Sequence, residues 1–412
     1  MRDPESLANP RLGLAFATML FVSGLANTFP IFFPPLLAEF GGSRAATAST
    51  VTLFWLGGAT LGPLAGHLVD RWNPRRLVML GLAAAALGFG IGALAPTRTV
   101  FVLAVGLGGG VGAGLTGMVA QAALIADAYV RRRGLATGIA FSGSMAAYAL
   151  ATPAQWAIDA VGWRGTFAGY AAAVAILLPL AWRICPARLG ARRGAPPAGA
   201  PAAGPGVRQI VGGAPFWLLS VVFTVPPLVG YLAIVQHALY FGSLGFSAQE
   251  AAAMLVVGGV LSTSGRALAG LAADRFGAPA AGLVSYACSL VGTLCLVGLE
   301  FAPGHALAYA YVLFVFLPLG SRATIVSVLV GRVAPPALYG TVFGLLAVGN
   351  NLGAAAGPLL SGALFDLTGS YLVIYLVAAA LLALGIAALA AFTRLTRRSS
   401  PSSLGRGAGG LR

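Results

Sequence analysis

Long apolar runs follow one another along almost the whole chain, and this feature limits the possible folds more than any other. A run of about 20 apolar residues crosses a bilayer as an α-helix. Only 8% of the residues are charged, against about 25% in an ordinary soluble domain. The sequence therefore predicts an all-α polytopic membrane protein with twelve transmembrane helices, at residues 12–38, 47–69, 77–95, 99–128, 134–160, 164–184, 213–241, 248–273, 279–299, 304–332, 338–365 and 370–393.

All 25 basic residues are arginines, and most lie in short clusters between the apolar runs. When successive loops are assigned to alternate sides of the membrane, 20 arginines fall on one side and 3 on the other, while Arg266 and Arg322 lie inside runs. Basic loops mark the cytoplasmic side. We therefore predict a plasma (inner) membrane protein with both termini in the cytoplasm. Such a basic excess is also typical of nucleic-acid binding, but its division among short loops favours membrane topology, and no nucleic-acid partner is predicted.

One stretch breaks the apolar pattern near the middle of the chain. Residues 186–212 are rich in Pro, Ala and Gly and carry several arginines, a composition typical of flexible linkers. This cytoplasmic linker would separate an N-terminal six-helix bundle, 1–185, from a C-terminal one, 213–395. Residues 396–412 are predicted to form a disordered cytoplasmic tail.

Three short motifs of the first half recur in the second at nearly one offset, which indicates an internal duplication. Two recur 204 residues later and one 207 residues later, each at a corresponding loop. The pairs are Gly66-x-x-x-Asp70-Arg71 with Gly270-x-x-x-Asp274-Arg275, Gly41-x-Ser43 with Gly245-x-Ser247, and Asp159-x-x-Gly162 with Asp366-x-x-Gly369. Parallel repeats of this kind place a substrate cavity between the two halves, near the middle of the membrane.

The loop between the second and third runs concentrates charge, in 66-GHLVDRWNPRRLVMLG-81. We interpret it as a charged cytoplasmic latch that holds one arrangement of the halves; the alternative is simple anchoring of two helix ends. The residues assigned to this latch are Gly66, Asp70, Arg71, Arg75 and Arg76, with Asp127 and Arg131 from the fourth loop and Gly270, Asp274 and Arg275 from the second copy.

These loop motifs resemble the signature of the major facilitator superfamily, with Asn73 in place of the loop glycine, and the resemblance covers about residues 10–395. It implies two pseudo-symmetric six-helix bundles and transport by alternating access. Further stretches are similar to the monocarboxylate-porter-like and oxalate/formate-antiporter-like branch: 39-EFGGSR-44, 162-GWRGTF-167, 265–277 and 340–371. In that branch an arginine of the eighth span engages a substrate carboxylate, and Arg266 occupies its place. The branch's acidic partner in that span is replaced by Ser262, and its lysines in the first and eleventh spans are missing, which leaves proton coupling open.

Arg266 and Arg322 are also candidates on physical grounds. A charge inside a span is costly and usually faces a cavity or a partner, and guanidinium matches a carboxylate with two parallel hydrogen bonds. The alternative for both is a structural arginine paired with carbonyl groups or an acidic residue. The other predicted substrate-binding residues are Asn27, Tyr148, Tyr231, His237, Asn350 and Asn351. For His237 the alternative is a packing role.

The sequence thus predicts a secondary transporter of a small organic anion such as a monocarboxylate, acting as a monomer. One alternative is a carrier of a neutral or amphipathic, drug-like solute, and another is a transport-like membrane sensor. No enzyme activity, cofactor or metal site is predicted. The glycine-rich stretch 106–117 lies inside an apolar run, so it is interpreted as a helix-packing surface rather than a phosphate-binding loop.

Overall fold

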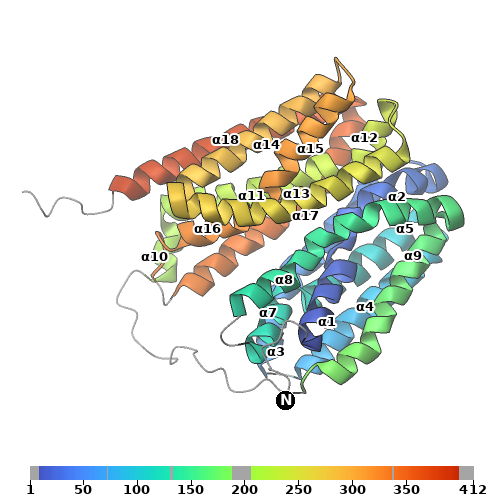
Figure 1. Ribbon diagram of the computed structural model, residues 1–412, viewed down its shortest axis with the longest axis horizontal. Coiled ribbons are helices and arrows are strands. Elements are labelled where there is room, and N and C mark those ends of the chain that lie inside the picture. The colour runs from blue at the N-terminus through green and yellow to red at the C-terminus, as the bar shows by residue number, and fades with distance from the viewer. Residues whose placement is uncertain (1–8, 72, 130–132, 188–205, 336–337, 399–412) are drawn as a thin grey trace, which may run out of the picture.

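The structure is a computed structural model that describes residues 9–71, 73–129, 133–187, 206–335 and 338–398, and every regular element in this part of the chain is a helix. The helices form two bundles, the first and second halves of the chain (Figure 1). The first half contains α1 (Pro10–Thr18), η1 (Met19–Ser23), α2 (Leu25–Phe40), α3 (Arg44–Arg71), α4 (Pro74–Ala93), α5 (Arg98–Leu103), η2 (Ala104–Gly108), α6 (Gly109–Thr116), α7 (Met118–Ala128), α8 (Arg133–Ala146), η3 (Ala147–Leu150) and α9 (Ala151–Ile184). The second half contains α10 (Val207–Gly212), α11 (Ala214–Ile234), α12 (His237–Ser243), α13 (Ala248–Phe276), α14 (Ala278–Leu299), α15 (His305–Leu319), α16 (Arg322–Val330), α17 (Tyr339–Thr368) and α18 (Tyr371–Arg398).

Several membrane passes are built from consecutive short helices. The first pass is α1, η1 and α2, and the tenth is α15 followed by α16. Conversely, α9 bends at Gly162, whose φ of 73° is not helical, so the 50-residue apolar stretch from Leu135 to Ile184 makes two passes. Within the described residues nine stretches are long and apolar enough to cross a membrane, and α3 and the α15–α16 pair complete the predicted set of twelve. The all-helical membrane fold is confirmed.

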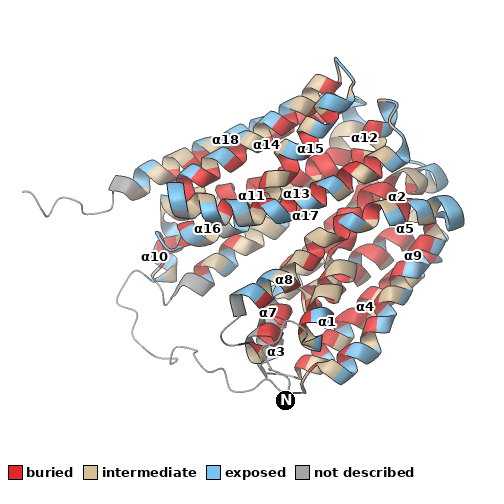
Figure 2. Ribbon diagram, in the orientation of Figure 1, coloured by how far each residue is buried: buried red, intermediate tan, exposed pale blue. Residues whose placement is uncertain are grey.

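Each half has buried residues between its helices and exposed residues on its outer side (Figure 2), and the exposed residues include large apolar ones. Leu87 and Ile176 are 65% and 63% exposed although each lies in the middle of a long helix. Such exposed leucine and isoleucine side chains are unfavourable in water and suit contact with lipid tails.

The glycine-rich fourth pass packs tightly against its neighbours. A Cβ atom added at Gly108 would lie 2.6 Å from the Cα of Gly88 in α4, a separation that no side chain tolerates. The glycines of this pass therefore allow two backbones to approach closely, as the sequence predicted, and they lie inside helices rather than in a phosphate-binding loop.

The two halves meet along α3 and α17, and α2 contacts α12. We call the end of the molecule that holds the start of α1 and the helix α10 the proximal end, and the opposite end the distal end. The halves lie close together at the distal end and diverge toward the proximal end (Figure 1).

The linker differs in part from the prediction, because its last six residues form helix α10. Gln209 accepts a hydrogen bond from the Gly206 N–H at 3.1 Å, which caps the helix, and Ile210 is buried. The last six residues of the predicted linker, 207–212, are therefore helical, and the linker itself stays a prediction. Residues 188–205 and 399–412, which include most of the rest of the linker and most of the predicted tail, lie outside the described residues.

Candidate functional site

Arg266 lies on α13, half-buried, beside the break between α15 and α16. Its Nε donates a hydrogen bond to the carbonyl oxygen of Gly320 at 3.3 Å. Among the side chains that the structure describes, no carboxylate lies within 4.0 Å of its guanidinium. Within the described residues, the one hydrogen bond of the guanidinium group therefore goes to a neutral carbonyl.

The face of α13 that carries Arg266 is turned toward the first half. The Ser262 Oγ lies 3.4 Å from the Met145 Sδ, and a Cβ added at Gly259 would lie 2.6 Å from the Tyr148 Cβ. Residues four apart lie on the same face of a helix. Arg266 follows Ser262 by four residues and so lies on this face, one turn nearer the proximal end.

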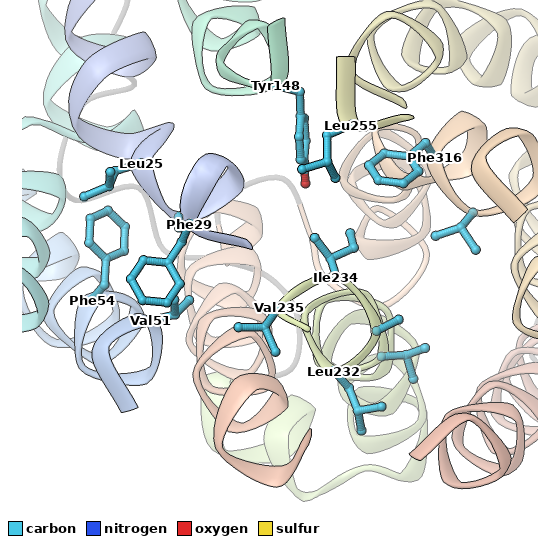
Figure 3. Close-up of a cluster of buried hydrophobic side chains, with 14 of the residues drawn as sticks. Leu25, Phe29, Val51, Phe54, Tyr148, Leu232, Ile234, Val235, Leu255 and Phe316 are labelled. Atoms are coloured by element: carbon cyan, nitrogen blue, oxygen red, sulfur yellow. The ribbon is translucent and has the colours of Figure 1, made fainter. Parts of the chain in front are cut away.

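Tyr148 is the aromatic contact between the halves next to this face. It is 1% exposed, and its ring packs edge-on against Phe316 of α15 with centroids 5.4 Å apart. Figure 3 shows Tyr148, which comes from the first half, beside Leu255 and Phe316 of the second. This contact closes the interface on the distal side of Arg266.

A second contact at the same interface is polar. The Tyr231 hydroxyl of α11 donates to the Asn27 Oδ1 of α2 at 3.0 Å, and the Asn27 Nδ2 donates to the Ser144 carbonyl at 2.8 Å. The indole ring of Trp55 lies against the Tyr231 ring, with centroids 5.2 Å apart. The structure thus brings together Asn27 and Tyr231, two predicted site residues from different halves, and adds Trp55, which the sequence analysis did not select.

For His237 and Asn350, the described hydrogen bonds lie within the second half. The His237 ring nitrogens lie 3.4 Å from the Tyr311 hydroxyl and 3.0 Å from the Ala251 carbonyl, and the side chain is 1% exposed. The Asn350 Nδ2 donates to the Phe223 carbonyl at 3.0 Å. Asn351 is half-buried on the same helix, α17. The contacts of His237 fit the packing role that was the alternative for it.

Arg322 points into the interior of the second half. It is 7% exposed, its Nη2 hydrogen-bonds the Ser289 hydroxyl, and its guanidinium lies 5.3 Å from the centre of the Tyr286 ring. Both partners belong to α14, whereas Arg266 contacts the helix break from α13. The two arginines therefore have different surroundings and do not form one paired cation site through shared partners.

At the distal end an acidic residue of the second half caps a helix of the first. Asp366, at the end of α17, accepts hydrogen bonds from the backbone N–H of Arg44 and of Ala45, each at 3.0 Å, and from the Ser43 hydroxyl. We call this set, Ser43, Arg44, Ala45 and Asp366, the distal contact. An anionic side chain is favourable at a helix N-terminus, where backbone N–H groups lack partners.

The Arg44 side chain adds further links across the distal contact. Its Nη1 donates to the Gln236 Oε1 at 2.8 Å and to the Tyr371 hydroxyl, and its guanidinium lies 3.4 Å from the centre of the Phe365 ring. The sequence analysis included Arg44 only in the stretch 39–44 that resembles the monocarboxylate-porter-like branch, and did not select it as a site residue. The recurring motifs Gly41-x-Ser43 and Asp159-x-x-Gly162 identified the two segments that form this contact. They did not indicate that the two segments lie together.

At the proximal end, the described side chains of the predicted charged latch contact their own half. The Arg11 Nη1 pairs with the Asp127 Oδ2 at 2.8 Å. The Arg75 Nε donates to the Cys185 carbonyl at 2.8 Å. Arg76 is exposed, and Arg275 lies over the ring of the adjacent Phe276. The surroundings of Gly66, Asp70, Arg71, Arg131, Gly270 and Asp274 lie outside what the structure describes, so the latch stays a prediction.

Cys185 lies at this proximal end, just after α9. Burial raises the pKa of its thiol to about 11 in spite of the nearby Arg11 and Arg75. The thiol is therefore uncharged near neutral pH, and it serves as a small packing group rather than a nucleophile.

Known proteins resemble this chain over nearly its whole length. It is 28% identical over 396 residues to monocarboxylate transporter 13 of Bos taurus, covering 94% of this chain and 90% of the relative. It is 29% identical over 398 residues to monocarboxylate transporter 11 of Homo sapiens, covering 90% of this chain and 80% of the relative.

Two solved structures share the fold. One is the nucleoside transporter NupG, with a TM-score of 0.73 at 13% identity over 93% of this chain and 100% of that one. The other is a bacterial homolog of the human lysosomal transporter Spinster in an inward-facing, unoccupied conformation, with a TM-score of 0.67 at 17% identity over 95% and 98% of the two chains. The family model described as Major Facilitator Superfamily matches residues 14–346. The chain therefore belongs to the major facilitator superfamily and is a membrane transporter rather than an enzyme.

Proposed function

We propose that this transporter carries a small organic anion, with a monocarboxylate as the first candidate, and that Arg266 holds the carboxylate. One observation carries the proposal: Arg266 is a cation on the face of α13 that meets the other half, and its one described hydrogen bond goes to a neutral carbonyl. A cation inside a membrane span is costly unless it faces a partner or a cavity. The names of the monocarboxylate transporter relatives support the same substrate class.

The path of the substrate follows from the asymmetry of the interface. The described hydrogen bonds between the halves lie at the distal end and in the middle of the membrane, including Thr52 Oγ1 to the Ala355 carbonyl at 2.8 Å. We infer that Arg266 is reached from the proximal side in this conformation. The arginine bias of the loops supports a cytoplasmic position for the proximal end, so this state would face the cytoplasm of a plasma membrane. Alternating access then requires the distal contact to break.

Counterflow in proteoliposomes tests the proposal without knowledge of the coupling ion. Liposomes loaded with unlabelled pyruvate or lactate are diluted into the labelled acid, and transient accumulation of label is followed. Arg266→Ala should lose at least about 90% of the flux, because a lost charge-assisted hydrogen bond is worth about 1.5–3 kcal/mol, or more than tenfold in affinity.

The matched control is Arg332→Ala, which removes an exposed arginine of the same half and should leave flux unchanged. Both variants are checked for folding by their unfolding temperature. Full flux in folded Arg266→Ala would remove Arg266 from the substrate site. Counterflow that succeeds can be repeated with an imposed pH gradient, which would establish whether a proton accompanies the anion.

A second candidate is a neutral or amphipathic solute. The observation that favours it is the aromatic surface around the interface, formed by Trp55, Tyr148, Tyr231 and Phe316. Such a surface binds rings and apolar groups without needing a charge. Flux of an uncharged aromatic solute that carboxylates fail to inhibit would support this candidate and return Arg266 to a structural role.

A further inference from the structure

Two exposed stripes lie on neighbouring helices of the first half, and each stripe begins with an arginine at the proximal end. Every leucine and isoleucine of the stripes is at least 42% exposed. The members of each stripe are spaced so that they share one face of their helix. The stripe of α4 is Arg76, Leu80, Leu87 and Ile91, and the stripe of α9 is Arg183, Leu180 and Ile176.

The start of α4 and the end of α9 contact each other at the proximal end. The Arg75 Nε donates to the Cys185 carbonyl at 2.8 Å, and the Arg75 guanidinium lies 5.2 Å from the centre of the Trp182 ring. Farther along, a Cβ added at Gly90 would lie 3.9 Å from the Ala171 Cβ. The two helices therefore lie side by side at the outer surface of the first half (Figure 1).

Three arginines gather where the two stripes begin, and we call Arg75, Arg76 and Arg183 the proximal arginine patch. Arg76 directly follows Arg75, and Arg183 directly follows Trp182, the ring that Arg75 contacts. Arg76 and Arg183 are exposed. Within the described residues, no carboxylate lies within 4.0 Å of any of the three guanidinium groups. The described side chains therefore give this patch a net positive charge that an anion can balance.

The patch lies where the exposed surface changes from charged to apolar. Leu80 is four residues from Arg76, a rise of about 6 Å along the helix, and Leu180 is three residues from Arg183. Both helices thus change from an exposed cation to an exposed aliphatic side chain within one turn, as expected at the boundary between lipid headgroups and acyl chains. Trp182 is 57% exposed at the same level, and tryptophan is enriched at this boundary.

We propose that this surface binds one anionic phospholipid, such as phosphatidylglycerol, from the leaflet at the proximal end. The phosphate lies between Arg76 and Arg183, because guanidinium groups donate paired hydrogen bonds to phosphate oxygens. The two acyl chains lie along the two apolar stripes. A second copy of the chain fits this surface less well, since a symmetric dimer would bring two positive patches together.

A specific lipid site differs from the general anchoring of arginines among headgroups. General anchoring makes no distinction between one proximal arginine and another, and it accepts any phospholipid. In the proposed site, Arg75 is held in place by the Cys185 carbonyl and the Trp182 ring. The site should therefore prefer an anionic headgroup, and the preference should depend on these arginines and not on others.

The first test measures this preference and uses the purified full chain. Detergent micelles contain equal amounts of phosphatidylglycerol and phosphatidylcholine, and native mass spectrometry counts the lipids that stay bound. We expect one phosphatidylglycerol per chain to be retained in preference to phosphatidylcholine. Arg76→Gln combined with Arg183→Gln should reduce the preference about 25-fold, because each arginine near an anionic lipid contributes about fivefold.

The matched control is Arg332→Gln combined with Arg394→Gln, which removes two exposed arginines from the second half and should keep the preference for the first bound lipid. Equal retention of the two lipids by the wild-type chain, or a preference that survives in the folded Arg76→Gln and Arg183→Gln chain, would overturn the proposal. A dimer without bound lipid in the same spectra would assign this face to a second copy instead.

A second measurement needs no arginine variant, so it holds even if the double variant fails to fold. Phosphatidylglycerol brominated in the acyl chains close to the headgroup should quench Trp182 more strongly than brominated phosphatidylcholine does, with the Trp182 signal taken as the difference from Trp182→Phe. Equal quenching by the two lipids would contradict the proposal. Glycerol phosphate, which carries the phosphate without acyl chains, should not reverse the quenching, and reversal at equal concentration would assign the patch to free phosphate.

Discussion

Two copies of one motif lie at the distal end, and only one of them ties the halves together through a helix N-terminus. In the first copy Asp366 accepts hydrogen bonds from the backbone N–H groups of Arg44 and Ala45. In the second copy the equivalent acid, Asp159, accepts no described hydrogen bond from a backbone N–H of α13. It is reached across the interface by the Gln249 side chain alone, at 2.6 Å.

The difference comes from one position in the repeat. Glu250 of the second copy corresponds to Ala46 of the first at the offset of 204. The Glu250 Oε2 accepts a hydrogen bond from the Ser247 N–H at 2.7 Å, and the Ser247 Oγ accepts from the Glu250 N–H at 3.2 Å. This capping box gives backbone N–H groups at the start of α13 hydrogen-bond partners within the same half. Alanine has no such side chain. At the start of α3, the Arg44 and Ala45 N–H groups therefore bond the Asp366 carboxylate from the other half.

The comparison indicates that one copy of a duplicated motif can bond its helix start within its own half, while the other copy bonds its helix start across the two halves. The first copy would then hold the distal end closed more strongly than the second. If alternating access requires the distal end to open, the distal contact around Asp366 is the larger part of the barrier. Three substitutions test this asymmetry, in order of the expected effect.

The largest effect is expected for Asp366→Ala. It removes the acceptor of the Arg44 and Ala45 backbone N–H groups, a loss of about 1–2 kcal/mol, and should raise the ratio of distal-open to distal-closed molecules about 5- to 30-fold. Spin labels at the exposed positions Thr99 and Ala302, in a chain whose three cysteines are replaced, would report the distance between the halves. The control Gln249→Ala, which removes the second copy's link, should change the ratio less than about fivefold, since an exposed polar contact is worth under about 1 kcal/mol. Equal shifts in the two variants would refute the asymmetry.

A smaller shift in the same direction is expected for Ala46→Glu. The new carboxylate is placed to form a capping box with Ser43, as Glu250 does with Ser247, and should compete with Asp366 for the start of α3. We expect the distal-open ratio to rise about 2- to 10-fold, since a cap is worth about 0.5–1.5 kcal/mol. Ala46→Gln, an uncharged control, should have a weaker effect. A distance distribution identical to that of the parent chain would mean that Asp366 still accepts the hydrogen bonds from the start of α3 in the presence of the new local cap.

The smallest effect, of opposite sign, is expected for Glu250→Ala. It removes the local cap of α13 and leaves backbone N–H groups for Asp159, so the distal end should close slightly more tightly. The substitution also frees His305, whose Nε2 lies 3.2 Å from the Glu250 Oε1. His305→Ala is therefore the control for loss of that exposed pair. The same spin labels give the readout, and a shift toward the distal-open state would contradict the idea that the second copy is weakened by its own cap.

Sequence alone determined the membrane class, the twelve passes and the division into two repeated halves. These features depend on local properties: the length of each apolar run must match the bilayer, and the positions of arginines follow from the cost of moving charge across it. The sequence also identified Arg266 as a site candidate, because a charge inside an apolar run is visible without a structure. The fine structure of the linker was missed, since α10 depends on a short cap and the burial of Ile210.

Only the tertiary structure decided which polar groups meet and where each buried cation points. The partners Arg44 and Asp366 are 322 residues apart, and nothing local to either residue specifies the other. Arg266 and Arg322 look alike in the sequence, yet one hydrogen-bonds the Gly320 carbonyl between α15 and α16 and the other the Ser289 hydroxyl of α14. The physical reason is that the direction of a side chain is set by how its helix is rotated and broken within the packed bundle. That rotation is fixed by the contacts of the whole chain and not by the run of residues around the arginine.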